Sequence, residues 1–137
     1  DKAGELALAA GARRCLPLKV SGPFHTTLMA PAGEALARRF RHESFGEMQI
    51  PVLFNCLGRE KSDTDTIPAL LEKQVQSSVY MEDTLRCLGE LGVTHILEVG
   101  PGKALSGFVK KTLGPSVACA SVETPAELDA VLTAWEV

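Results

Sequence analysis

The sequence lacks the features that mark several large classes of protein. No apolar run approaches the roughly 18 residues that a membrane-spanning helix needs, and no signal-peptide pattern is visible. The net charge is only −3, so the chain has none of the basic excess that is typical of proteins bound to nucleic acid or to anionic membranes. We therefore expect neither nucleic acid nor a membrane as a partner.

The four cysteines form no recognisable metal or redox motif. Cys15, Cys56, Cys87 and Cys119 show no C-x-x-C spacing, and no histidine lies near them at a metal-ligand spacing. Three of them fall in apolar strand or helix contexts, which is typical of buried free thiols in a reducing compartment. We therefore expect no metal and a cytoplasmic location.

The 137 residues, of which 45% are hydrophobic, suffice for one domain with a core. Helical and strand patterns alternate with short links, which predicts an α/β fold with a mostly parallel sheet. Residues 58–65 are polar and charged, which predicts a surface loop. The predicted strands are Cys15–Val20, Val52–Phe54, His95–Val99 and Val117–Ala120, and the predicted helices are residues 2–12, 28–40, 66–75, 81–91, 103–113 and 125–135.

The stretch Leu16–Met29 combines a strand, a tight turn and the start of a helix. Gly22-Pro23 ends the strand, because glycine permits unusual dihedral angles and proline cannot donate to a strand ladder. His25 follows at the strand end, where ligands and catalytic groups gather in open α/β sheets. Such a histidine can act as a general base near neutral pH, or it can simply satisfy a hydrogen bond of the turn.

Other candidate features favour structural roles. His95 lies inside an apolar strand, and His42 lies in a charged stretch where solvation is expected. The Gly100–Lys103 segment, G-P-G-K, lacks the G-x-x-x-x-G-K-[ST] spacing of a phosphate-binding loop. We interpret it as a sharp turn between a strand and a helix.

Four segments, in order along the chain, resemble the malonyl-CoA:acyl carrier protein transacylases, which are acyltransferases of fatty acid and polyketide synthesis. The first, V-S-G-P-F-H-T-T-L-M, resembles the active-site histidine segment of that family. The second, Pro51–Asn55, is similar to its next core strand. The third, Lys73–Met81, is similar to a helix end and loop, and the fourth, Gly92–Leu105, contains E-V-G-P-G-K-A-L. The four segments occur in the same order as in the family, and the resemblance covers nearly all of the chain.

The resemblance implies transfer of a malonyl group from coenzyme A to the phosphopantetheine thiol of acyl carrier protein, through a serine ester and without a cofactor. His25 is implied to be the base that takes the proton of the serine hydroxyl. The main-chain carbonyl of Gln74 is implied to hold the imidazole in the correct tautomer. Phe24 is implied to favour malonyl over methylmalonyl, although simple packing under the turn explains it equally well. Asn55, at the end of its strand, is expected near the substrate.

The serine nucleophile of that family is absent from the sequence. No G-x-S-x-G motif occurs, and the family's oxyanion segment and carboxylate-binding arginine lie upstream of the histidine. The chain also opens at Asp1 rather than at a methionine. The resemblance therefore implies a C-terminal portion, inactive alone, that needs the N-terminal part of the enzyme as a partner. Residues 1–14 would be the last helix of a small ferredoxin-like subdomain, and residues 15–137 the C-terminal part of an α/β hydrolase-like subdomain.

Two alternatives remain open. The chain could be a fragment of an acyltransferase domain from a polyketide synthase, or a non-catalytic remnant that binds a carrier protein. Carrier proteins are acidic, so their docking surface is expected to be basic. The candidate pairs for that surface are Arg13 with Arg14 and Lys110 with Lys111.

Overall fold

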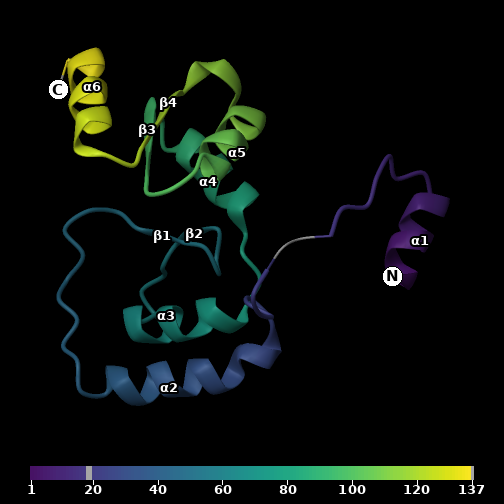
Figure 1. Cartoon of the computed structure of the whole chain (residues 1–137). Coiled ribbons are helices and arrows are strands. Elements are labelled where there is room, and N and C mark those ends of the chain that lie inside the picture. Colours follow the sequence, from purple (N-terminus) through teal and green to yellow (C-terminus); the bar gives the residue numbers. More distant parts are fainter. Residues whose placement is uncertain (18–19, 137) are drawn as a thin grey trace.

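The computed structural model describes residues 1–17 and 20–136, and it is a mixture of helices and strands, as the sequence predicts (Figure 1). None of the helices in these ranges is both long enough and apolar enough to cross a membrane. The helices are α1 (Lys2–Ala9), α2 (Ala30–Phe40), α3 (Ile67–Gln76), α4 (Met81–Glu90), α5 (Ala104–Thr112) and α6 (Pro125–Trp135), and the strands are β1 (Leu53–Phe54), β2 (Arg59–Glu60), β3 (His95–Val99) and β4 (Ala118–Val122).

The strands of the described residues form two separate pairs, so the prediction of one mostly parallel sheet is wrong in this respect. Strands β3 and β4 are parallel, with His95 opposite Ala118. Strands β1 and β2 are antiparallel, with Phe54 opposite Arg59. Residues 58–65, predicted as a loop, therefore contribute strand β2 at their start. The physical reason is the tight reversal after Phe54, whose carbonyl oxygen accepts two main-chain N–H groups, 2.9 Å away in each case.

The predicted strand Cys15–Val20 is not confirmed. Residues 15–17 and Val20 have no strand pairing, and Leu18 and Lys19 lie outside the described residues. The side chains of Leu16 and Val20 are 63% and 69% exposed. An apolar segment becomes a strand only when a neighbouring strand accepts its main-chain hydrogen bonds, and no described strand pairs with these residues.

Helices α2 and α3 lie side by side and antiparallel (Figure 1). The main core cluster includes Leu70 of α3. That cluster consists of Phe54, Cys56 and Leu70, with Met48, Leu57, Ile67 and Leu71 packed against it. Gly33 of α2 is buried, and a Cβ there would lie 2.6 Å from Nε2 of Gln76. A larger residue at position 33 would therefore have to displace the end of the Gln76 side chain.

The cysteines divide by exposure. All four are free thiols, but only Cys56 is buried, while Cys87 and Cys119 are half-buried and Cys15 is exposed. The expectation that three of the thiols are buried is therefore wrong, because one is buried and two are half-buried. Cys15 belongs to the predicted strand that has no pairing in the described structure, which explains why it is exposed to solvent.

A carboxylate from β3 fixes the start of α5. Glu98 accepts hydrogen bonds from the main-chain N–H of Leu105 (3.1 Å) and of Ser106 (2.8 Å), and from the Ser106 hydroxyl (2.6 Å). These donors, the Ser106 hydroxyl foremost, hold the pKa of Glu98 below its usual value. The first N–H groups of a helix lack partners within it, so Glu98 acts as a cap supplied from a neighbouring strand.

Gly58 provides a test of the turn between β1 and β2. It has a φ of +70°, and a Cβ there would lie 2.6 Å from Cβ of Asp83 and 3.2 Å from Cβ of Tyr80. We expect Gly58→Ala to lower the free energy of unfolding by about 2–4 kcal/mol, the sum of left-handed strain and overpacking.

Gly92→Ala is the matched control, because Gly92 has a similar φ of +75° but open space around it. The free energy of unfolding of this variant should fall by only about 1–2 kcal/mol, which is the cost of the left-handed conformation. Urea denaturation measures the free energy of unfolding of both variants. Equal decreases in the two variants would contradict the close approach of Gly58 to α4.

Glu98 also makes stability depend on pH. Its pKa is lowered in the folded state, so the folded state resists protonation more than the unfolded state does. The stabilisation is therefore complete above the unfolded pKa of about 4.3 and is lost as the pH falls through the folded pKa. Lowered pKa values of Asp65 and Glu127 act in the same direction.

We expect the urea midpoint of the chain to fall on acidification from about pH 6 to about pH 3.5, over the range where carboxylates take up protons. Glu98→Gln should lower the midpoint at pH 6 and make its decline with acid less steep. Glu90→Gln, at the exposed end of α4, is the control and should follow the unaltered chain. Parallel curves for Glu98→Gln and the unaltered chain would refute this role of Glu98.

Candidate functional site

The segment around His25 is a turn that leads into α2. The hydroxyl of Thr26 donates to the carbonyl oxygen of Pro23 (2.8 Å) and accepts from the N–H of Leu28 (3.3 Å). Thr26 thereby caps the single 3-10 turn Thr27–Met29 that precedes α2. Pro31 occupies the first turn of α2, a position that suits its fixed φ. These contacts fix the backbone directly after His25.

His25 is attached to the end of α3 at two points. Its main-chain N–H donates to the carbonyl oxygen of Val75 (3.2 Å), and its ring Nδ1 lies 2.9 Å from the carbonyl oxygen of Gln74. Both carbonyls belong to the last turn of a helix, where carbonyl oxygens lack partners within the helix. His25 has a φ of +62°, which is rare for a residue with a side chain, and the two hydrogen bonds offset that strain.

The contact with Gln74 defines which ring nitrogen of His25 is free. A carbonyl oxygen can only accept, so Nδ1 carries the hydrogen in this arrangement. In the neutral ring Nε2 is then an acceptor, and the side chain is exposed. An imidazole held in this way can take a proton from a hydroxyl or thiol that comes within hydrogen-bond reach of Nε2.

Phe24 lies directly before His25 and is 54% exposed. Its ring packs over Gly22, because a Cβ at Gly22 would lie 3.3 Å from the ring atom Cε2. The Phe24 ring thus contacts the turn through one edge, and about half of its surface is exposed to solvent. Packing under the turn accounts for only part of its surface.

Asn55 lies in the turn between β1 and β2. Its carbonyl oxygen accepts from the N–H of Tyr80 (2.8 Å), which ties this turn to the start of α4. Its side-chain Oδ1 is buried and has no hydrogen-bond partner among the described residues. The hydrogen bonds of those residues do not join Asn55 to His25. The structure therefore brings His25 and Gln74 together, with Phe24 adjacent, and places Asn55 on a separate turn.

Sequence reasoning missed two residues that position His25. The carbonyl of Val75 shares the attachment to α3, and no side-chain pattern could reveal a main-chain acceptor. Thr26 was detectable, because a threonine before a helical segment is a common cap.

The other histidines and the glycine turn have the structural roles expected of them. The ring of His95 packs edge-on against Trp135, with ring centroids 4.9 Å apart, and His42 is exposed. The N–H of Gly102 donates to Oε1 of Glu123 (2.7 Å), so a carboxylate of the chain already binds this turn. Within residues 1–17 and 20–136, no group of three His, Cys, Asp or Glu side chains is arranged to hold a metal ion.

Sequence comparison identifies relatives of the chain over nearly its whole length. It is 38% identical over 133 residues to the malonyl CoA-acyl carrier protein transacylase of Salmonella typhimurium, covering 97% of this chain and 43% of the relative. It is 41% identical over 111 residues to the protein of that name from Bacillus subtilis, covering 81% of this chain and 35% of the relative. The chain therefore spans about two fifths of the length of these relatives. No protein-family model matches it.

Solved structures agree with the sequence comparison. The malonyl CoA-acyl carrier protein transacylase of Clostridium perfringens superposes with a TM-score of 0.89 at 35% identity, over 98% of this chain and 42% of that one. A malonyl-transacylase in complex with a type II polyketide synthase acyl-carrier protein superposes with a TM-score of 0.85 at 35% identity, over 97% of this chain and 43% of that one. Over the part of their length that it spans, the chain belongs to the malonyl CoA-acyl carrier protein transacylase family.

Proposed function

We propose that the chain supplies the catalytic base of a malonyl-CoA:acyl carrier protein transacylase, and that the serine nucleophile comes from the part of the enzyme that the chain does not span. The observation that carries the proposal is the attachment of His25 to the end of α3. The Nδ1 hydrogen bond to Gln74 leaves Nε2 of this exposed residue able to accept a proton. Gln74 is thus a positioning residue that acts through its main-chain oxygen.

The proposed reaction has two half-reactions that use the same imidazole. First, Nε2 takes the hydroxyl proton of serine while the oxygen attacks the thioester carbonyl, and the imidazolium returns that proton to the departing coenzyme A thiolate. In the second half, Nε2 takes the proton of the phosphopantetheine thiol, the sulfur attacks the serine ester, and the imidazolium protonates the departing serine oxygen. No cofactor is needed, because each half-reaction exchanges one acyl bond for another.

Phe24 and Asn55 are proposed to contact the acyl group and its surroundings. The half-exposed ring of Phe24, which directly precedes His25 in the chain, would crowd an α-methyl branch of the substrate. One methyl group contributes only about 1–3 kcal/mol to discrimination between two substrates. The buried Oδ1 of Asn55 is costly without a donor, so a donor from substrate or from the rest of the enzyme would relieve it.

The subdomain assignment remains a proposal as well. We propose that residues 1–14 are the last helix of a ferredoxin-like subdomain and that residues 15–137 are the C-terminal part of a hydrolase-like subdomain, acting with the N-terminal part of the enzyme. In Figure 1, α1 stands apart from the other helices, and it contains no buried residue. A helix without buried residues needs a partner to pack on, which supports its assignment to a second unit.

His25→Ala tests the proposed base. In an enzyme completed by joining the chain to the N-terminal part of a relative, this variant should lower malonyl transfer about 10²–10⁴-fold, the usual scale for loss of a general base. His42→Ala is the control, since His42 is exposed and separate from the α3 attachment, and it should keep full activity. Near-normal turnover by His25→Ala would exclude His25 as the base.

The isolated chain gives a second test. Without a G-x-S-x-G motif it should form no covalent malonyl adduct when incubated with malonyl-CoA, because no activated serine is present. Intact-mass spectrometry would detect such an adduct directly. The completed enzyme is the positive control, and an adduct on the isolated chain would mean that one of its own residues is the nucleophile.

A further inference from the structure

The turn that carries His25 is closed by a side chain. The hydroxyl of Thr26 donates to the carbonyl oxygen of Pro23 (2.8 Å), so this hydrogen bond passes back across His25. A tight turn of four residues is often closed by the main-chain N–H of its last residue. Among the described residues, no main-chain hydrogen bond joins Thr26 to Pro23. The Thr26 hydroxyl therefore takes the place of a main-chain donor.

His25 needs this closure because its backbone is strained. Its φ of +62° lies in the left-handed region, which residues with a side chain rarely adopt. The main-chain N–H of His25 is held by Val75, so a change in φ would swing Cβ and the ring about the N–Cα bond. Relaxation of His25 to a negative φ would therefore move Nδ1 away from the carbonyl oxygen of Gln74.

The same hydroxyl oxygen connects the turn to the helical segment that follows it. It accepts from the N–H of Leu28 (3.3 Å), in the 3-10 turn before α2. Thr26 has an extended backbone, with a φ of −130° and a ψ of 165°, which suits a β-branched residue. One oxygen atom thus joins the residues before His25 to the residues after it.

We propose that Thr26 is a positioning residue, whose hydroxyl holds His25 in the left-handed conformation and thereby keeps Nδ1 on Gln74 and Nε2 free. The inference rests on the proposed function, because it concerns how that same base is kept ready. A helix cap needs only an acceptor oxygen, whereas closure of this turn also needs a donated hydrogen. A hydroxyl both donates and accepts, so serine can replace Thr26 and valine cannot.

The test uses the completed enzyme with variants of two adjacent threonines. Thr26→Val keeps the branched shape but lacks the hydroxyl, and Thr26→Ser restores the hydroxyl. Thr27→Val is the matched control, because Thr27 is exposed and its hydroxyl makes neither of the hydrogen bonds that hold the turn. For each variant we would measure the maximal rate of malonyl loading, KM for malonyl-CoA and the ¹⁵N NMR signals of the His25 ring, which differ between tautomers. His25→Ala identifies those signals.

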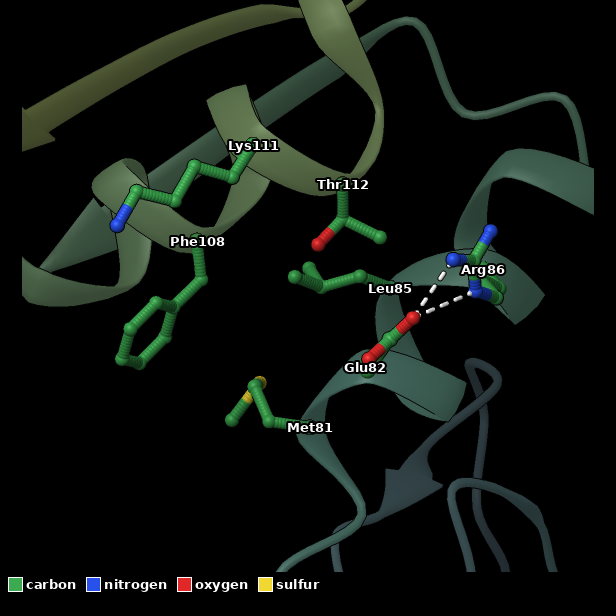
Figure 2. Close-up of a pocket in the computed structure, with 7 residues that line it drawn as sticks. All are labelled: Met81, Glu82, Leu85, Arg86, Phe108, Lys111 and Thr112. Carbon is green, nitrogen blue, oxygen red and sulfur yellow. Dashed lines mark hydrogen bonds and ion pairs between the residues drawn. The ribbon is translucent and has the colours of Figure 1, made fainter. Parts of the chain in front are cut away.

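A second control removes exposed hydrogen bonds from another helix. Figure 2 shows Arg86 of α4 donating to Oε1 of Glu82, which lies 2.6 Å from Nη2 and 3.1 Å from Nε. This pair borders a hollow of about 400 Å³ between α4 and α5, and the residues that line the hollow belong to those two helices. Arg86→Met removes both hydrogen bonds, and it shows whether the loss of exposed hydrogen bonds away from the His25 turn affects malonyl loading.

We expect Thr26→Val to lower the maximal rate of malonyl loading about tenfold, the scale of one or two lost hydrogen bonds. KM should stay within about twofold, because the variant alters the base rather than substrate binding. At about pH 8.5, where an imidazole is ordinarily neutral, the ring of His25 should change from the Nδ1–H tautomer to a mixture of both tautomers. Thr26→Ser should recover most of the rate and the Nδ1–H tautomer, and the two controls should match the unaltered enzyme.

Retention of the Nδ1–H tautomer in Thr26→Val would overturn the proposal, even with a lower rate, because the hydroxyl would then act only on stability. Equal effects of Thr26→Val and Thr27→Val on rate and tautomer would overturn it as well. If the completed enzyme loads no malonyl group in any form, the proposed function fails, while the tautomer of His25 still decides the role of Thr26.

Discussion

The two hydrogen bonds between His25 and the end of α3 are the contact on which the candidate site depends. They join segments 49 residues apart and give the imidazole one orientation and one tautomer. The same contacts require the turn before α2 to meet the last turn of α3. Gly33 lies where the two helices converge, and a Cβ there would displace the side-chain amide of Gln76. The packing of α2 against α3 and the orientation of the His25 ring therefore depend on the same contacts.

Carboxylates organise the other half of the described structure. Glu98 caps the start of α5 from β3, Glu123 accepts from Gly102, and Glu127 accepts from the main-chain N–H groups of Glu123 and Thr124. The glycine turn between β3 and α5 is thus held by acidic side chains of the chain itself. Glu98 thus joins the first turn of α5 to β3.

The helices were predictable from the sequence, and the strand pairing was not. Helix ends follow from local signals. At the start of α6, for example, a threonine followed three residues later by a glutamate, Thr124 and Glu127, forms a reciprocal capping box. Pairing depends on a neighbour, so the apolar pattern of Cys15–Val20 gave no warning that its described residues would be unpaired. At the candidate site, the meeting of His25 with Gln74 was predicted through a family resemblance. Val75 was missed because its contribution is main-chain.

A peptide oxygen as the partner of an imidazole has a consequence for mutational drift. Every amino acid provides this carbonyl, so the identity of the side chain at position 74 is free to vary while the acceptor persists. A carboxylate in its place would be lost through most single substitutions, and acid would neutralise it. The hydrogen bond to His25 depends instead on the geometry of the last turn of α3. Substitutions that unwind the last turn of α3, above all to proline or glycine, would displace the acceptor without touching the histidine.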